Sequence, residues 1–155
     1  MRRFKQQVSD AECKKILTEE KRAAFSVIGD DGYPYTIPID FYFDEADNRI
    51  YFHGAKEGHK VDAIKKCNKV CLTVWNQGFK KDGNWEWNVT SVVVFGKALL
   101  VDNPVLIEDR LRKLAKKYYP TLDDVEKEMT GPAFNRVQFF AIEIEHMTGK
   151  LVNEK

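Results

Sequence analysis

The chain has 155 residues, of which 43% are hydrophobic, so it has the composition of a folded globular protein and the length of a single domain, residues 1–155. Its 25 Lys and Arg nearly balance its 24 Asp and Glu, giving a net charge of +1, which argues against a dedicated nucleic-acid-binding protein. It contains no apolar stretch long enough to span a bilayer and no apolar run after its charged N-terminus, so we expect a cytoplasmic protein without membrane contact.

The first predicted elements are a helix and a strand. Ser9 can cap a helix whose capping box is completed by Glu12, and this helix is expected to end near Glu20. A short apolar run over 23–28 predicts a strand. The Asp-Asp-Gly sequence at 30–32 then predicts a tight turn, so the chain should reverse direction there.

A strand with alternating side chains follows the turn. Apolar and polar residues alternate over 35–43, which predicts one half-buried strand with a second face toward solvent or a ligand. Pro38 cannot donate to a strand ladder, so an edge position, a bulge or a broken pairing is expected there. A polar turn and a strand over 49–53 complete a hairpin, and a short helix is predicted over 60–67.

The next strands form the most apolar part of the chain. A continuous apolar run over 70–75 predicts a strand, and a polar loop is expected over 76–84. The β-rich run over 87–101 is too long to stay straight, and Gly96 is the expected site of its bend.

Two helices and a strand are predicted at the C-terminal end. Asn103 followed by proline starts one helix, and Thr121 starts a second that should stop at 131–132. A last strand is expected over 136–146. Because most connections between strands are short, the order of elements favours a mainly β (α+β) fold, an antiparallel barrel of about six strands with peripheral helices.

The segment after the 49–53 strand has the features of an anion site. His53 ends the strand, a loop rich in small residues follows, and a helix begins near His59. Free amides at a helix start attract anions, and Lys56 and Lys60 add side-chain donors, so the segment could hold a phosphate. The alternative is a surface loop with solvated lysines, and the residues alone favour this alternative.

The sequence resembles the FMN-binding split-barrel superfamily related to pyridoxamine 5'-phosphate oxidase, and within it the branch that includes the 5-nitroimidazole resistance (Nim) proteins. The resemblance runs over nearly the whole chain. No single segment decides it, and the combination is more specific for the fold and the flavin than for a substrate. It is carried by segments 31–35, 37–39, 51–60, 91–98 and 148–150.

This resemblance implies an FMN cofactor, a homodimer with the cofactor at the subunit interface, and a set of binding positions. The flavin ring and ribityl chain would lie along one strand and beside the end of another, and the phosphate would lie at the loop and helix start. Two further positions would approach the cofactor, in part from the partner subunit. The implied positions are Pro38, Ile39, Asp40, Phe41, His53, Gly54, Lys56, His59, Lys60, Thr90 and Ser91.

Two departures from the oxidase pattern limit what is implied. An arginine stands in the oxidase where His59 stands here, and histidine is a weaker, pH-dependent phosphate ligand. Nothing matches the oxidase's extra C-terminal segment that binds pyridoxal phosphate. We therefore do not expect oxidation of vitamin B6.

Other candidate residues have open readings. His53 is a candidate proton donor to the flavin or substrate, or an ordinary hydrogen-bonding histidine. Three tryptophans around the 76–84 loop are candidates for an aromatic wall over the flavin or for packing in the core or at a dimer interface, and we expect packing for at least one of them: Trp75, Trp85 and Trp87. The three histidines lack ligand spacing, so no metal site is expected, and the three cysteines fit reduced thiols.

Together these features predict an FMN-dependent oxidoreductase that acts on a small, electron-poor substrate such as a nitroaromatic. The missing catalytic constellation fits an enzyme whose reactive atom belongs to the cofactor. It fits equally a non-catalytic flavin- or haem-binding redox or sensor protein of the same fold. A deazaflavin- or haem-using enzyme of the superfamily is a further alternative.

Overall fold

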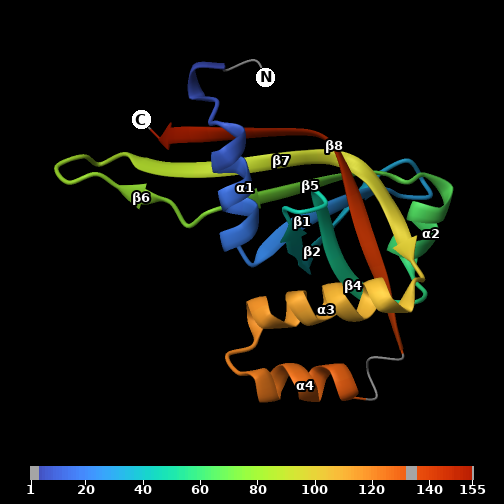
Figure 1. Ribbon diagram of the computed structural model, residues 1–155. Helices are drawn as coiled ribbons and strands as arrows, with labels where there is room; N and C mark the ends of the chain where they lie inside the picture. Colours follow the sequence, from blue (N-terminus) through green and yellow to red (C-terminus); the bar gives the residue numbers. More distant parts are fainter. Residues whose placement is uncertain (1–3, 132–135, 155) are drawn as a thin grey trace.

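The computed structural model describes residues 4–131 and 136–154. Its strands form one curved antiparallel sheet, and its helices pack around this sheet (Figure 1). They are a 3-10 turn Phe4–Gln6, α1 (Asp10–Glu19), β1 (Arg22–Ile28), β2 (Pro34–Asp40), β3 (Tyr42–Asp44), β4 (Arg49–Ala55), α2 (His59–Lys66), β5 (Lys69–Trp75), β6 (Phe79–Lys80), β7 (Trp87–Val101), α3 (Pro104–Tyr118), α4 (Leu122–Thr130) and β8 (Val137–Glu154).

The sheet has eight strands in the order β2-β1-β5-β7-β8-β4-β3, with β6 paired to β7. Every pairing between strands is antiparallel, so the predicted antiparallel barrel class is confirmed. β2 and β3 are neighbours in sequence but lie at opposite ends of this order. The sheet therefore curls until its two edges are joined by the short link at Phe41, which gives a split barrel.

The expected number of about six strands is wrong for two reasons. The alternating run over 35–43 forms two strands, because the chain leaves the β1 ladder at Phe41 and then pairs with β4. A two-residue strand, β6, also forms within the expected 76–84 loop, where it pairs with β7. Pro38 does lie on an edge strand, as expected, because β2 ends the sheet.

The local capping signals act as the sequence predicts. The Ser9 hydroxyl accepts from the Glu12 amide at 3.2 Å, and the Asn103 side chain accepts from the Leu106 amide at 3.1 Å. Thr121 caps α4 in the same way. α4 ends at its C-cap Gly131, whereas the following proline lies outside the described residues.

The long strand β7 bends where predicted. Its register with β8 shifts between Phe95 and Gly96, and a side chain at Gly96 would meet the Glu143 carbonyl oxygen. β8 is longer than the expected 136–146, because its last residues pair with the first half of β7. With β6 they form an arm that projects away from the barrel (Figure 1).

The buried residues form two clusters. The larger lies inside the barrel and includes Phe25, Phe41 and Phe52, none of which is exposed. The smaller lies beneath α3 and α4 and includes Tyr51, Leu111 and Phe139. α3 and α4 lie side by side below β4, whereas α1 crosses β7 on the other part of the molecule (Figure 1).

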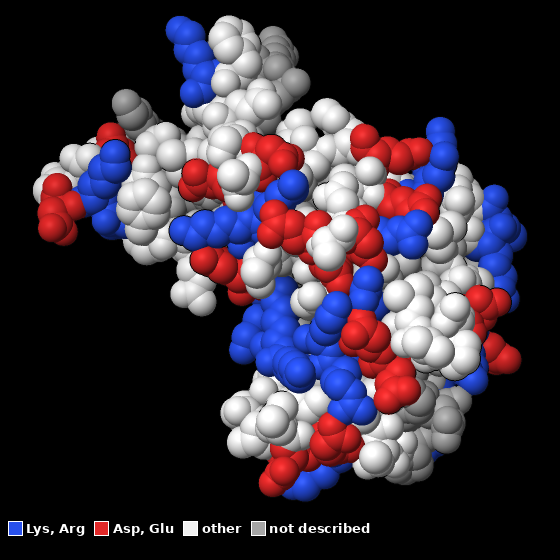
Figure 2. Space-filling view, viewed as in Figure 1, with Lys and Arg blue, Asp and Glu red and all other residues white. Residues whose placement is uncertain are grey.

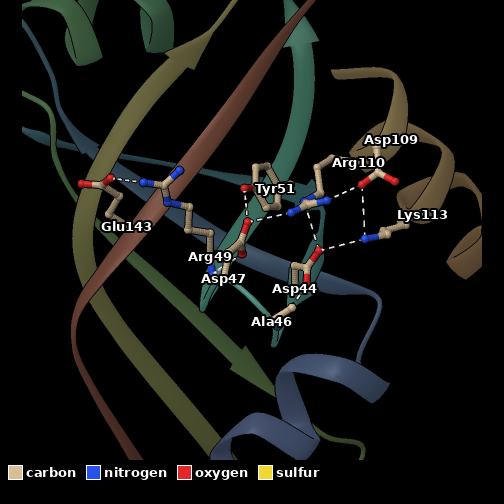
Figure 3. Close-up of polar contacts among 9 residues, drawn as sticks. All are labelled: Asp44, Ala46, Asp47, Arg49, Tyr51, Asp109, Arg110, Lys113 and Glu143. Carbon is tan, nitrogen blue, oxygen red and sulfur yellow. Dashed lines mark hydrogen bonds and ion pairs between the residues drawn. The ribbon is translucent and has the colours of Figure 1, made fainter. Parts of the chain in front are cut away.

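A partly buried ion-pair network fixes α3 to the β3–β4 hairpin (Figure 3). Arg110 Nε lies 3.0 Å from Asp44 Oδ2, and Arg110 Nη2 lies 3.0 Å from Asp47 Oδ2. Tyr51 donates its hydroxyl to Asp47 at 2.5 Å, and Lys113 Nζ lies 3.3 Å from Asp44 Oδ2. Asp44 is only 4% exposed, so its charge depends on these partners.

Charges are mixed over the visible surface. Lys and Arg side chains form one denser group over α3, with Asp and Glu side chains around it (Figure 2). Of the helices in the described chain, none is long and apolar enough for a membrane span. In those same residues, no group of three His, Cys, Asp or Glu side chains is placed to hold a metal ion.

Candidate functional site

A cavity of about 390 Å³ opens where the end of the β1–β2 hairpin faces β4 and the start of α2. It collects side chains from four elements that are separate in sequence. Five of its lining residues are positions that the resemblance implies, and the sixth, Arg22, was not among them. The lining residues are Arg22, Pro38, Ile39, Asp40, His53 and Lys60.

Lys60 supplies the cationic end of this cavity. Its ammonium group lies 5.7 Å from the centre of the Phe140 ring, and burial lowers its pKa. A Cβ atom at Gly54 would lie only 2.3 Å from Lys60 Nζ, so the glycine gives the lysine its space. Within residues 4–131 and 136–154, no carboxylate forms an ion pair with Lys60. A half-buried cation without a carboxylate partner favours an anionic ligand.

The first turn of α2 adds backbone donors beside this lysine. Gly58 is the N-cap residue, and no side chain caps the helix there. Its φ of 129° lies in the region that favours glycine. Helix amides without a side-chain cap are available to an anion, and the helix dipole favours negative charge at this end. The loop and helix start therefore have the donors that a phosphate group requires.

The structure separates His59 from its neighbour Lys60. The His59 ring packs edge-on against the Tyr35 ring at 4.4 Å, and Nε2 lies 3.2 Å from where a Cβ of Gly29 would be. His59 is exposed and does not line the cavity. Lys56 is exposed in the preceding loop and does not line it either. Lys60 is thus the lysine that the fold turns into the site.

His53 and Asp40 give the cavity its other polar groups. His53 lies partly buried on β4, and Asp40 is the last residue of β2. The Asp40 carboxylate pairs with Arg22 across the ladder, with Nε 3.3 Å from Oδ1. The cavity is therefore lined by a half-buried cation, an exposed ion pair and an imidazole.

The remaining implied positions do not line this cavity. Phe41 is fully buried, and its backbone amide and carbonyl both contact the Tyr118 hydroxyl. Thr90 is buried, and its amide donates to the Asn76 side chain at 2.9 Å. Ser91 is the next residue of β7 and lies on the opposite face of the sheet from Thr90. In the strand ladder it is paired with Trp75 and Lys150.

A larger hollow of about 740 Å³ adjoins the cavity along the outside of β1 and β2. The two share Arg22 and Pro38, and Trp75 forms one wall of the larger hollow. Within one chain, Trp75, Trp85 and Trp87 are 51%, 69% and 37% exposed. None of them belongs to the core of the single chain, and Trp87 packs against the neighbouring loop, where its Nε1 donates to the Gln77 carbonyl at 3.1 Å.

Two important residues carried no recognisable signal in the sequence. Arg22 enters the cavity because the first strand pairs with the second, and Tyr118 reaches Phe41 across 77 residues of chain. Their neighbours along the chain show no motif. Only the tertiary structure brings them to the site.

The chain belongs to the pyridoxamine 5'-phosphate oxidase family, whose family model matches residues 9–151. This confirms the superfamily that the sequence resembles. A search of curated proteins finds no match.

Solved structures of other proteins have the same fold. A candidate 5-nitroimidazole antibiotic resistance protein from Bacteroides thetaiotaomicron is 20% identical, with a TM-score of 0.77, over 95% of this chain and 87% of that chain. An FAD-binding protein from Mesorhizobium loti is 21% identical, with a TM-score of 0.68, over 95% and 97%. The flavocytochrome Anf3 from Azotobacter vinelandii is 22% identical, with a TM-score of 0.77, over 98% and 72%. At these identities the likeness establishes the fold.

Proposed function

We propose that this protein binds FMN in the Lys60 cavity and works as a flavin-dependent oxidoreductase. The observation that carries the proposal is the half-buried Lys60 ammonium, which has no carboxylate partner in the described chain and lies in the first turn of an uncapped helix. Similar structures include a protein described as FAD-binding and a flavocytochrome, which supports a flavin as the ligand.

Each part of the cavity has a role in this proposal. Lys60 and the first amides of α2 hold the phosphate, because both favour negative charge. Pro38 and Ile39 give the ring and ribityl chain a wall on the edge strand, and the Asp40 carboxylate accepts hydrogen bonds from hydroxyl groups. His53 lines the same space and is the group able to pass a proton near neutral pH.

Bound FMN would supply the redox chemistry, the transfer of an electron pair from a reduced donor such as a reduced nicotinamide to a small, flat, electron-poor acceptor such as a nitroaromatic. The polypeptide binds and orients the reactants. Proton transfer from His53 balances the charge that develops on the acceptor. The B. thetaiotaomicron protein's description supports a nitro compound as the acceptor.

We also propose a homodimer formed through the outer face of the sheet. The strand register places Ala24, Thr73 and Val93 in one row of small side chains on this face. Phe95, 48% exposed, and Trp75 extend the same surface. A second copy seated here would bury these apolar groups and would meet Ser91, which the resemblance places near the partner's cofactor.

The decisive experiment is FMN titration, followed by quenching of flavin fluorescence, of the wild type, Lys60→Met and Lys65→Met. Lys60→Met should weaken binding about 10- to 100-fold, because it removes a charge-assisted contact to phosphate. Lys65→Met removes an exposed charge from the same helix and should leave affinity unchanged. Equal affinities in all three proteins would place the phosphate elsewhere.

Absorbance and turnover separate the remaining alternatives. The purified protein should show flavin bands, whereas a Soret band would identify a haem protein. Oxidation of a reduced nicotinamide with a nitroaromatic acceptor should require bound flavin. Flavin binding without such turnover would favour a redox carrier or sensor.

A further inference from the structure

The hydroxyl group of Tyr118 occupies the end of the β1–β2 ladder. The last paired residues there are Arg22 and Asp40, so Lys21 and Phe41 would form the next pair. They do not pair. Instead the Phe41 amide donates to the Tyr118 hydroxyl at 2.7 Å, and this hydroxyl lies 2.9 Å from the Phe41 carbonyl oxygen and also contacts the Lys21 carbonyl oxygen.

A phenol has one hydrogen, so it donates to one of these two carbonyl groups at a time while it accepts from the Phe41 amide. The hydroxyl thus replaces one rung of the ladder with a bridge that includes both strands. Burial raises the pKa of Tyr118 to about 12, so the phenol keeps its hydrogen throughout the physiological range.

Contacts at both ends of α3 hold the Tyr118 hydroxyl group in place. Tyr118 is the last residue of the helix, and Lys117 beside it lies 4.1 Å from the centre of the Phe41 ring and donates to the Leu17 carbonyl at 3.3 Å. Arg110, two turns earlier, binds the carboxylates of Asp44 and Asp47 (Figure 3). The helix therefore connects the end of α1, the link between β2 and β3, and the β3–β4 hairpin.

The bridged rung directly adjoins the cavity. Arg22 and Asp40, the neighbouring pair, both line it, and Ile39 and Pro38 follow along β2. A strand end without a hydrogen-bonded rung frays, and the side chains on it lose their fixed positions. Tyr118 keeps this end closed although it does not line the cavity itself.

We propose that Tyr118 is a positioning residue for ligand binding: by bridging Lys21 and Phe41 it fixes the Arg22–Asp40 wall of the cavity. The inference rests on the proposed function, in which this cavity binds FMN. Tyr118 acts through the two strands, and its loss should change affinity and the orientation of the bound ring more than the overall fold.

The test compares Tyr118→Phe with the wild type and with Tyr33→Phe, which removes a hydroxyl from a tyrosine that is 72% exposed between β1 and β2. Tyr118→Phe should bind FMN at least about tenfold more weakly. It should also change the visible circular dichroism of the bound flavin, which reports the asymmetry of its surroundings, while the far-ultraviolet spectrum stays the same. Tyr33→Phe should match the wild type in all three measurements.

The outcomes distinguish this inference from the proposed function. If the wild type bound no FMN, the proposed function would fall and the inference with it. If Tyr118→Phe bound FMN with the wild-type affinity and spectrum, the inference alone would be overturned. Hydrogen exchange of the wild type gives a second measurement if the variant does not fold. FMN should slow exchange at the Phe41 amide, and an unchanged rate would also overturn the inference.

Discussion

Lys117 allows a test of how much a largely buried charge lowers the stability of this protein. Its side chain packs between the Phe41 ring and the end of α1, and burial lowers its pKa to about 8, with the carboxylates of Glu20 and Asp40 opposing the shift. The nearby Lys21 ammonium contributes to this lowered pKa. The folded state therefore disfavours the charged form of this lysine, even though an aromatic ring and a carbonyl oxygen contact it.

The difference between the ordinary pKa of 10.5 and a value of about 8 corresponds to at most about 3 kcal/mol of unfolding free energy. Partial solvent access reduces this, so we expect Lys117→Met to stabilise the protein by about 1–2 kcal/mol at pH 7. Methionine keeps most of the apolar stem and removes the charge.

The sign of the pH dependence follows from proton binding. Between about pH 8 and 10.5 the unfolded chain holds a proton on Lys117 that the folded protein has released, so the wild type gains stability as the pH rises through this window. Below about pH 8 both states are protonated, and the full cost of burying the charge is present. The advantage of Lys117→Met should thus shrink as the pH approaches 10.5.

Urea unfolding of the wild type, Lys117→Met and the exposed control Lys116→Met at pH 7 and pH 10 would measure this. Other groups titrate equally in the three proteins, so the differences between them isolate Lys117. If Lys117→Met were less stable than the wild type at pH 7, the ring and carbonyl contacts would outweigh the cost of burial. A stability difference that stays constant with pH would refute the reasoning as well.

Two further predictions concern the anchoring of α3 and the outer sheet face. Arg110→Met leaves the Asp44 carboxylate buried without its closest cation, so we expect the free energy of unfolding in urea to fall by about 2–4 kcal/mol. The control Arg112→Met breaks more exposed ion pairs and should lower it by less than about 1 kcal/mol. Similar losses of stability in the two variants would show that the Arg110 ion pairs stabilise the protein no more than the exposed pairs of Arg112. Phe95→Lys should convert a dimer to a monomer in analytical ultracentrifugation, whereas Val105→Lys on exposed α3 should not. A Phe95→Lys dimer would exclude this face as the interface.

The local features of this protein were readable from its sequence. Ser9, Asn103 and Thr121 cap their helices because a capping side chain needs only the amides of the next turn. Gly96 marked the bend of β7, because glycine, which has no side chain, is a frequent place for a long strand to bend. Such signals act within a few residues and do not depend on the rest of the fold.

The composition of the cavity was only partly readable. The segment resemblance indicated Lys60 and the edge strand, but it gave His59 and Lys60 the same role. On α2 these neighbours point in different directions, since successive residues of a helix are about 100° apart around its axis. Lys60 lies against Gly54 inside the cavity, and His59 packs on Tyr35 outside it.

By itself, the sequence determined the helices, most of the strands and the mainly antiparallel class, because caps, turns and alternation are local. Only the tertiary structure decided that the 35–43 run divides at Phe41, since the division depends on the two strand edges closing and on a hydroxyl group from Tyr118. It also decided that Arg22 and Lys60 line one cavity. Contacts between residues far apart in the chain follow from sheet curvature and helix docking, which no short stretch of sequence encodes.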